Sequence, residues 1–278
     1  MTQNNLAVWG DPIDHSRSPL LHAAAYDVLG LEWNYARRQV DADGFDSALA
    51  ELDASWRGLS LTMPLKERAF AAATSRDRHA TLTGAVNTLH FAVDGLRGYN
   101  TDVGGLGRAL RRQGIEEADT ARIVGAGATA ASALVTLVDL GARRIEVAAR
   151  NPLKAAALVE LGAALQVLVV PSALGADTAA RVDVTIGTLP GGTRLDGSVA
   201  DALAAEGGAL LDVAYSPWPS ALAEHWFAQG KGAISGLSML VEQALLQVRI
   251  FVAGAPEAEL PNEPAVLLAM RDAVGLAS

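Results

Sequence analysis

The sequence predicts an α/β protein of two domains, each built on a sheet whose strands alternate with helices. Short β-type runs alternate with helical patterns along most of the 278 residues. The helical patterns span about 10–12 residues, a length typical of right-handed crossovers between parallel strands. Half of the residues are hydrophobic, which is enough apolar surface for two cores of ordinary domain size. These three observations define the fold class before any motif is considered.

The first half of the chain is expected to begin with a strand at residues 6–10. Ser18 and Pro19 then predict a helix start, with Ser18 as the N-cap, and Gly30 predicts its end. Further strands are expected at 33–40, 58–63 and 85–91, and further helices begin at Asp43 and after Pro64. Residues 94–95 are a turn signal, which favours a hairpin that returns through 96–99.

The second half shows a more regular alternation, ending in a helical tail. Helices are expected at 101–113, 129–140, 152–161, 199–205 and 220–229, and strands at 122–124, 143–149, 165–170, 182–186 and 209–213. Two helical patterns follow, at 237–252 and 264–274, with no strand between them. Residues 103–236 therefore predict a doubly wound domain and residues 1–102 a separate sheet domain, while the pattern alone leaves open where the tail packs.

Composition and charge exclude several classes of function. The net charge is −9, which argues against a nucleic-acid or anionic-membrane partner. There is no cysteine, and the five histidines are scattered, so neither thiolate catalysis nor a histidine-built metal site is expected. We find no secretory signal and no apolar run approaching the roughly 18–20 residues of a membrane span. The expectation is a soluble, cytoplasmic, globular protein.

A glycine-rich turn follows the strand predicted at 122–124 and opens the next helix. In such a turn, the first glycine permits the tight bend, the second admits a pyrophosphate, and a small third residue lets the helix pack on the strand. The helix N-terminus then faces the phosphates with free N–H groups. Glycine turns without a ligand are also common, but this context favours a dinucleotide on a Rossmann domain. The residues concerned are Gly125, Ala126, Gly127, Ala128, Thr129 and Ala130.

The end of the following strand indicates which dinucleotide is bound. NAD-binding Rossmann units usually carry an acid there, about 20 residues beyond the loop, to bond the ribose 2′-hydroxyl. Here the strand ends in Arg150 and Asn151, and Lys154 follows on the next turn, in a chain with 19 arginines but three lysines. Cations at this position favour the 2′-phosphate of NADP. The plainer interpretation is that they are ordinary surface cations.

Polar residues cluster where the strands of the first half end. They occupy residues 11–19, 62–66, 87–88 and 100–102. In open α/β sheets, ligands bind outside the carboxyl ends of the strands, so we expect these segments to converge on one polar pocket.

The ordered set of motifs resembles the shikimate dehydrogenase family, and the resemblance runs across nearly the whole chain. Its members reduce 3-dehydroshikimate to shikimate with NADPH, in the pathway to chorismate and the aromatic amino acids. The matching segments are 10–19 (GDPIDHSRSP), 61–66 (LTMPLK), 84–88 (GAVNT), 99–102 (YNTD), 125–127 (GAG), 149–151 (ARN) and 236–243 (GLSMLVEQ).

The resemblance implies a role for each matching residue and a place for the tail. Lys66 and Asp102 would be catalytic, and Thr188 and Gly236 would join the glycine turn in holding NADP. It also implies that 237–278 complete the N-terminal substrate domain, leaving 103–236 as the Rossmann NADP-binding domain. The implied substrate-binding residues are Ser16, Ser18, Thr62, Asn87, Thr101, Tyr215 and Gln243.

Plainer interpretations stand beside these roles. Ser18 and Asp102 could simply be helix caps, Asn87 a turn residue and Lys66 a solvated lysine. Asn151 precedes a proline where the family usually has a threonine-containing turn, which leaves the strength of NADP selectivity open.

Rival functions are also considered. They are an NAD-dependent quinate/shikimate dehydrogenase, a methylenetetrahydrofolate-type dehydrogenase and a catalytically silent NADP-binding regulator. Arg150 argues against the first, the polar rather than aromatic residues against the second, and the presence of Lys66 and Asp102 against the third. The sequence leaves open whether the protein is a monomer or a homodimer.

Overall fold

The computed structural model describes residues 4–175 and 180–276. The chain divides into two compact units, which are considered separately. Unit 1 comprises residues 1–105 and 240–278, and unit 2 comprises residues 106–239. The divisions fall within the helices α5 (Thr101–Arg111) and α10 (Gly236–Ala253), three residues after the boundaries expected from the sequence.

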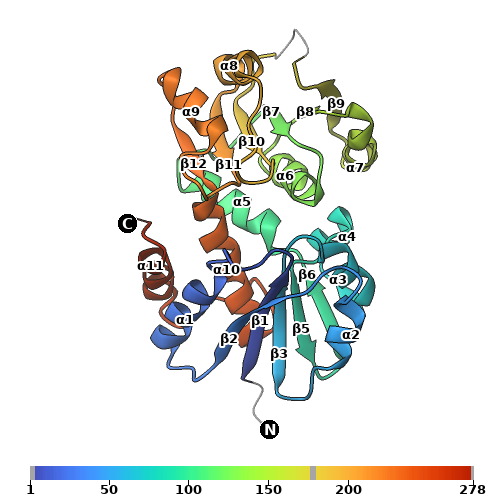
Figure 1. Ribbon diagram of the computed structural model, residues 1–278, viewed down its shortest axis with the longest axis vertical. Coiled ribbons are helices and arrows are strands. Elements are labelled where there is room, and N and C mark those ends of the chain that lie inside the picture. The colour runs from blue at the N-terminus through green and yellow to red at the C-terminus, as the bar shows by residue number, and fades with distance from the viewer. Residues whose placement is uncertain (1–3, 176–179, 277–278) are drawn as a thin grey trace. The chain divides into compact units, whose positions relative to one another are not determined.

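Unit 1 contains a six-stranded mixed sheet in the order β2-β1-β3-β5-β6-β4 (Figure 1). Its strands are β1 (Asn5–Gly10), β2 (Asn34–Gln39), β3 (Trp56–Leu61), β4 (Ser75–Arg76), β5 (Thr88–Ala92) and β6 (Gly95–Tyr99). The strands β1, β2 and β3 are parallel, whereas β5 runs antiparallel to both β3 and β6. The hairpin expected at 94–95 is the link between β5 and β6.

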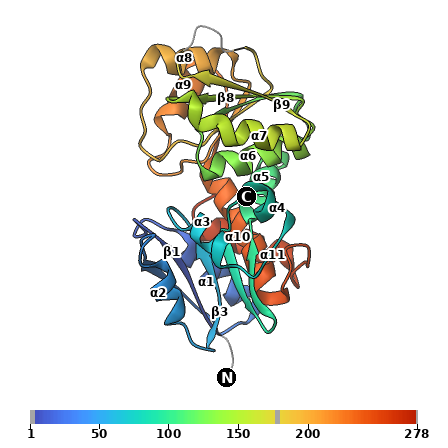
Figure 2. The same ribbon diagram turned by 90° about the vertical axis from the view of Figure 1, so that its right-hand side faces the viewer.

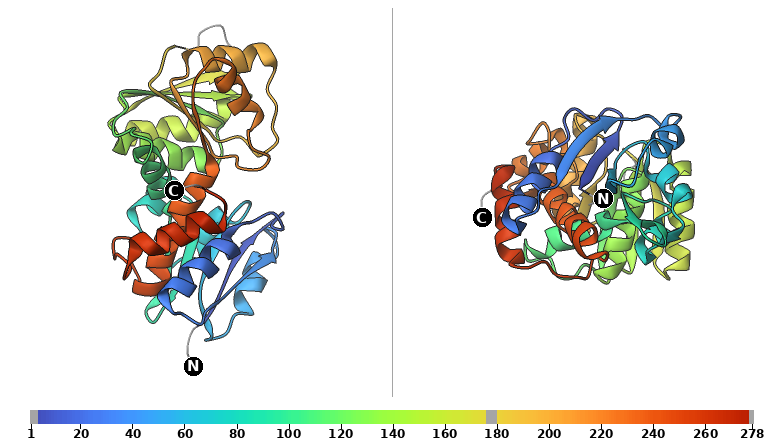
Figure 3. Two further views of the ribbon diagram at one scale, coloured as in Figure 1. Left: turned by 90° about the vertical axis from the view of Figure 1, so that its left-hand side faces the viewer. Right: turned by 90° about the horizontal axis from the view of Figure 1, so that it is seen from below.

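Helices cover both faces of this sheet. One core joins the sheet to α2 (Phe45–Ala50), α3 (Lys66–Ala72) and α4 (Arg78–Thr83), with Trp9 and Phe45 fully buried in edge-to-face contact. The helix α1 (Ser18–Leu29) packs against α11 (Glu263–Ala273), as Figure 3 shows. Hydrogen bonds from Arg57 and Tyr99 to backbone carbonyls of Phe251 and Gly254 also tie the tail into unit 1.

Unit 2 is a doubly wound parallel sheet in the order β12-β11-β10-β7-β8-β9. The helices α6 (Ala128–Asp139) and α7 (Ala156–Ala164) lie on one face, and α8 (Gly197–Glu206) and α9 (Ala221–Ala228) on the other (Figure 2). A short 3₁₀ helix, Pro152–Ala155, precedes α7. The strands are β7 (Thr120–Val124), β8 (Arg144–Ala149), β9 (Leu168–Ala173), β10 (Val184–Gly187), β11 (Ala209–Asp212) and β12 (Ala233–Ser235).

Several local expectations are wrong. Ser18 is not the N-cap of α1, because Arg17 holds that position and no side chain caps the helix. Asp43 does not cap α2 either; Gly44 is its N-cap, and its backbone N–H donates to Asp41 Oδ1. The short elements β4, α4 and β12 were not anticipated, because so few residues carry too little periodic signal.

The expectation that no apolar segment approaches membrane-spanning length also needs correction. Within the described residues, α10 is long and apolar enough by length and composition to cross a membrane. However, 72% of its 18-residue window is buried inside the protein, and it carries the buried polar residues Gln243, Gln247 and Arg249. We therefore interpret α10 as a core helix.

Candidate active site

The strand directions in unit 1 bring distant polar segments to one edge of its sheet. Because β5 is antiparallel to β3 and β6, the residue before β5 lies beside the residues after the other two strands. Accordingly, the backbone N–H of Leu61 donates to the carbonyl of Asn87 at 2.7 Å, and the N–H of Asn87 donates to the carbonyl of Tyr99 at 3.0 Å. The segments 62–66, 87–88 and 100–102 therefore meet, as the sequence predicted.

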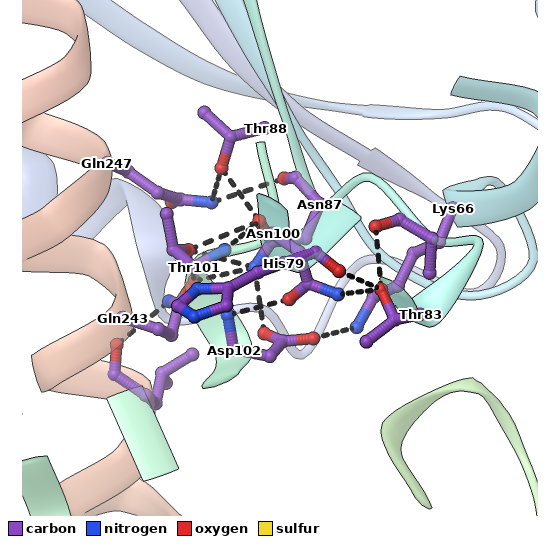
Figure 4. A network of polar contacts seen from close by, with 12 residues as sticks. Lys66, His79, Thr83, Asn87, Thr88, Asn100, Thr101, Asp102, Gln243 and Gln247 are labelled. Carbon is purple, nitrogen blue, oxygen red and sulfur yellow. Dashed lines mark hydrogen bonds and ion pairs between the residues drawn. The ribbon is translucent and has the colours of Figure 1, made fainter. Parts of the chain in front are cut away.

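Lys66 and Asp102 form an ion pair within this cluster. Lys66 is the first residue of α3, and Asp102 lies in the first turn of α5. The ammonium Nζ donates to Asp102 Oδ2 at 2.5 Å, and the two side chains are 14% and 7% exposed (Figure 4). Little water therefore competes for either group, and a charged hydrogen bond in such surroundings is stronger than one at the surface. The interpretation of Lys66 as a solvated lysine is wrong.

Asn87 is the centre of the hydrogen-bonding network. Its Oδ1 accepts from the backbone N–H of Thr101 at 2.9 Å and from the Thr88 hydroxyl at 2.8 Å. Its Nδ2 donates to Asp102 Oδ1 at 2.8 Å and to the Thr101 hydroxyl at 2.9 Å. The two donors on one side and the carboxylate on the other determine which way the amide points. Asn87 is thus more than a turn residue, and each oxygen of Asp102 has its own donor.

The tail reaches this cluster through Gln243. Its Oε1 lies 3.3 Å from the Thr101 hydroxyl and 3.4 Å from Asn87 Nδ2. The approach depends on Gly105, where a Cβ atom would lie only 2.6 Å from the Cβ of Gln243. A larger residue at this position would separate α5 from α10, so Gly105 is required by close helix packing.

Three further candidates lie beside the ends of the first and third strands. Ser16 and Ser18 lie before and at the start of α1, and the Ser16 hydroxyl accepts from the Ser18 backbone N–H at 3.3 Å. Thr62 follows β3, and its backbone N–H donates to the carbonyl of Trp9 at 2.9 Å. Ser16 and Thr62 are partly exposed and Ser18 is buried. These hydroxyls therefore lie at the same carboxyl edge as the ion pair.

In unit 2 the glycine turn lies at the carboxyl end of β7. Gly125 has φ of +119°, and a Cβ atom there would lie 2.5 Å from the Thr188 hydroxyl, so both conformation and space require glycine. Gly127 is the N-cap of α6, and a Cβ atom there would meet nothing within 4 Å. The open space in front of this helix N-terminus suits a phosphate. Ala126 precedes the cap, and Ala128, Thr129 and Ala130 form the first turn of α6.

The cations predicted to distinguish the cofactors follow β8, the neighbour of β7. Arg150 and Lys154 are both exposed, the second within the 3₁₀ helix. Asn151 is the N-cap of that helix, and its side chain accepts from the Leu153 backbone N–H at 3.0 Å. Since Asn151 serves the backbone in this way, the cationic side chains are better suited to recognise a phosphate.

The remaining predicted residues all belong to unit 2. Thr188 follows β10, and its backbone N–H donates to the Val124 carbonyl at 2.8 Å. Gly236 begins α10, and a Cβ atom there would lie 2.0 Å from the Val213 carbonyl oxygen, so packing alone requires glycine. Tyr215 is partly exposed in the loop after β11, in unit 2. The structure thus groups Thr188 with the glycine turn.

Two members of the network in unit 1 had no predicted role, although Asn100 lies in the polar segment 100–102 that was expected to converge. Asn100 accepts from the backbone N–H of Asp102 at 3.0 Å and donates to the Thr83 hydroxyl at 2.8 Å. Gln247 donates to the Thr88 hydroxyl at 3.0 Å. A signal for Gln247 was present in the sequence, because it follows Gln243 by one helical turn and interrupts an apolar run.

Burial shifts the pKa of the ionisable groups behind the cluster. It lowers the pKa of His22 from 6.5 to about 3, despite a hydrogen bond to Gln247 that raises it. It also raises the pKa of Tyr35, partly offset by hydrogen bonds to Ser60 and Ser18. Both groups are therefore neutral at physiological pH, and neither acts as an acid or a base there.

A Rossmann unit and a unit with a buried lysine–aspartate pair together define a nicotinamide-dependent oxidoreductase of two domains. A model of the shikimate dehydrogenase substrate binding domain matches residues 8–89. The shikimate dehydrogenase (NADP(+)) of Sphingopyxis alaskensis is 34% identical over 268 residues, covering 91% of this chain and 92% of that protein. The chain belongs to the shikimate dehydrogenase family.

Solved structures agree with this assignment. Mycobacterium tuberculosis shikimate dehydrogenase has a TM-score of 0.85 and 37% identity, covering 97% of this chain and 99% of that one. Shikimate 5-dehydrogenase from Thermus thermophilus, solved in complex with NADP(H) and shikimate, has a TM-score of 0.81 and 29% identity, covering 98% of this chain and 100% of that one.

Proposed function

We propose that Lys66 and Asp102 carry out the proton transfer of an NADP-dependent shikimate dehydrogenase. The enzyme reversibly reduces 3-dehydroshikimate to shikimate, in agreement with the names of its relatives. The observation that carries the residue assignment is the buried ion pair at 2.5 Å, surrounded by neutral hydrogen-bonding groups. A polyhydroxylated acid needs such hydroxyl and amide partners and few apolar walls.

Lys66 is the proposed proton donor. Reduction of a ketone places negative charge on its oxygen, so a donor within hydrogen-bonding distance both stabilises that charge and supplies the proton. An ammonium group does both, and Asp102 Oδ2 holds it in place. In the reverse direction the neutral amine accepts the proton of the shikimate hydroxyl.

Asp102 and Asn87 have the proposed task of orienting the lysine and the ring hydroxyls. Asp102 Oδ1 accepts from Asn87 Nδ2 while Oδ2 accepts from Lys66. The carboxylate is therefore fixed at both oxygens before any substrate arrives, which reduces the reorganisation needed during reaction. Thr101 and Gln243 extend the same polar surface.

The hydroxyls of Ser16 and Ser18 are the proposed anchors for the substrate carboxylate, with Thr62 beside them. The hydrogen bonds that hydroxyl groups donate to a carboxylate are charge-assisted and therefore directional. The family resemblance implies that Tyr215 is a further substrate-binding residue, and we include it in the proposal as such.

The residues of unit 2 fit NADP. The open space before Gly127 and the free N–H groups of α6 suit the pyrophosphate, Thr188 flanks the turn, and Arg150 and Lys154 suit the 2′-phosphate. When bound, NADPH supplies the hydride. We further propose residues 103–236 as the cofactor domain and the remainder as the substrate domain.

A panel of assays at the NADPH absorbance band tests the proposal. Shikimate with NADP should react fastest, shikimate with NAD much more slowly, and quinate with either cofactor little. Comparable rates with NAD would favour the quinate/shikimate alternative, and no turnover would favour a silent regulator. The proposal also places the enzyme in the cytoplasm, as a monomer or homodimer without a nucleic-acid or membrane partner; light scattering tests its oligomeric state.

A further inference from the structure

Behind the candidate active site, Gln247 uses both ends of its amide within unit 1. Its Nε2 donates to the Thr88 hydroxyl at 3.0 Å and to the Asn87 carbonyl at 3.2 Å. Its Oε1 accepts from the Ser60 hydroxyl at 2.8 Å and lies 3.3 Å from His22 Nε2. Gln247 is 2% exposed, and Thr88 and His22 are fully buried, so water does not replace these bonds.

The bonds on the Nε2 side form a chain with one polarity that ends at the ion pair. Gln247 donates to Thr88, the Thr88 hydroxyl donates to Asn87 Oδ1, and Asn87 Nδ2 donates to Asp102 Oδ1 (Figure 4). Because the Thr88 hydroxyl accepts from Gln247, its single proton is directed to Asn87. The Gln247 amide therefore reinforces the orientation of Asn87, which the backbone N–H of Thr101 and the Asp102 carboxylate also favour.

The bonds on the Oε1 side determine the orientation of Gln247 itself. The Ser60 hydroxyl accepts from the Tyr35 hydroxyl at 2.6 Å, which leaves its own proton for Gln247 Oε1. His22 Nδ1 lies 3.0 Å from the Tyr26 hydroxyl, and the His22 ring is stacked on Tyr35 at 3.9 Å. A neutral His22 with its proton on Nε2 satisfies both neighbours, accepting from Tyr26 and donating to Gln247.

The same branch runs toward the proposed anchor for the substrate carboxylate. Tyr35 donates to Ser60, and the nearby Ser18 hydroxyl partly offsets the burial that raises the pKa of Tyr35. Gln247 therefore lies between Asn87 and the residues that neighbour Ser18. None of the motifs that indicated the family function includes this residue.

We propose that Gln247 is a positioning residue for the dehydrogenase reaction. It acts through Thr88 and Asn87 on Asp102, and Ser60 and His22 hold its own amide in place. This rests on the proposed function, since it presumes that Asp102 serves the reaction. The role requires a donor and an acceptor on one side chain of this length, which only an amide supplies at neutral pH. Methionine supplies no donor and only a weak acceptor, and an ionised glutamate supplies only acceptors.

The test combines steady-state kinetics with thermal unfolding of the full chain. Gln247→Met should lower kcat by about 10- to 100-fold, the scale expected when catalytic groups are misaligned. Its Kd for NADP should stay within about twofold, because the glycine turn and Arg150 lie in the other unit. Val248→Ala is the matched control, a fully buried apolar position next along α10. It should lose thermal stability while keeping kcat.

Two further variants separate positioning from mere packing. Gln247→Glu should lose kcat as the pH is raised through the pKa of its carboxyl, because only the protonated carboxyl donates to Thr88, and wild type should show no matching fall. The groups facing position 247 are His22, Ser60 and Thr88, with Tyr35 beyond them. Thr88→Val removes the intermediate hydroxyl, so Gln247→Met combined with Thr88→Val should lose much less than the product of the single losses.

The outcomes distinguish this inference from the proposed function. An inactive wild-type enzyme contradicts the proposed function itself. An active wild type with unchanged kcat in Gln247→Met, or an equal kcat loss in Val248→Ala at matched stability, overturns the role of Gln247. Multiplicative losses in the double variant also overturn it. If Gln247→Met does not fold, Thr88→Val and the pH profile of Gln247→Glu decide: an unchanged kcat in Thr88→Val or a flat profile overturns the role.

Discussion

The ion pair of unit 1 and the cations after β8 in unit 2 occupy opposite environments. Lys66 and Asp102 are 14% and 7% exposed and are held by neighbouring side chains, whereas Arg150 and Lys154 are exposed. A buried pair interacts through little water and is insensitive to salt, whereas exposed cations are screened over about 10 Å at 0.1 M salt. We therefore expect the first region to serve chemistry on a fixed substrate, and the second to discriminate between similar cofactors.

Removal of the buried cation is the strongest test of this difference between the two regions. Lys66→Ala should lower kcat by about 10²–10⁴-fold, the usual contribution of a positioned acid–base group, with cofactor affinity nearly unchanged. Asp102→Asn should be similarly impaired, and the double variant should lose far less than the product of the single losses, because the pair acts as a unit. Steady-state kinetics and NADP titration measure both.

Lys231→Ala provides the control for the loss of a lysine. Lys231 Nζ donates to the carbonyls of Ala204 and Ala205 at 2.6 Å, near the end of α8 in unit 2. Its removal should affect stability and not kcat. Near-wild-type turnover in Lys66→Ala would rule out the assignment of the proton donor.

A smaller effect is expected for the exposed region. Arg150→Ala should lower kcat/KM with NADP by about 10- to 100-fold, the contribution of a charge-assisted hydrogen bond. The preference of the wild type for NADP over NAD should decrease at high salt, because exposed charges are screened. Arg150→Asp should reverse the preference, since a carboxylate repels the 2′-phosphate and accepts from a 2′-hydroxyl.

Arg143→Ala controls for the loss of an arginine charge. Arg143 precedes β8, at the opposite end of the strand from Arg150, and pairs with Asp119. Its removal should leave the preference unchanged. Equal use of NAD and NADP by the wild type at low salt would contradict the role of Arg150.

Within unit 1, the anchor hydroxyl should matter less than the ion pair. Ser18→Ala should raise KM for shikimate about tenfold, because a hydroxyl bonded to a carboxylate contributes about 1.5–3 kcal/mol. The Tm should change little, since Ser18 is not the cap of α1. A Tm loss with unchanged KM would show that the role of the Ser18 hydroxyl is purely structural.

The smallest effect at neutral pH concerns His22, whose pKa is lowered by burial to about 3. Between about pH 3 and pH 6.5, His22 binds a proton in the unfolded chain but not in the folded one. The free energy of unfolding therefore falls as the pH drops below 6.5. At pH 5.5 this free energy is lower by about 1.4 kcal/mol than at high pH. The groups around the ring are Tyr26, Tyr35 and Gln247.

Denaturant unfolding between pH 7.5 and 5 measures this slope. In His22→Gln the slope of the unfolding free energy against pH should be smaller by the contribution of about one proton. His15→Gln, at an exposed position, should retain the full slope. His90, whose pKa is also lowered, contributes equally to all three proteins. An identical slope in wild type and His22→Gln would show that His22 is not held neutral.

Residues adjacent in the sequence carried most of what could be predicted. The turn at 125–130 and the cations at 150 and 154 follow single strands, so local pattern and spacing were sufficient to place them at one edge of a parallel sheet. The segments 62–66, 87–88 and 100–102 were also expected to converge. That their convergence depends on an antiparallel β5 was not expected, because strand direction follows from long-range pairing.

The sequence by itself determined the alternation of strands and helices, the glycine turn and the identity of the polar residues at the strand ends. Tertiary structure alone decided that Lys66 is paired with Asp102, that Ser18 is not a cap and that Gln247 supports Asn87. The physical reason is that propensities and turn conformations depend on near neighbours. The direction of hydrogen bonds within a buried cluster depends instead on groups far apart in the sequence, such as Asn87 and Gln247, whose positions differ by 160.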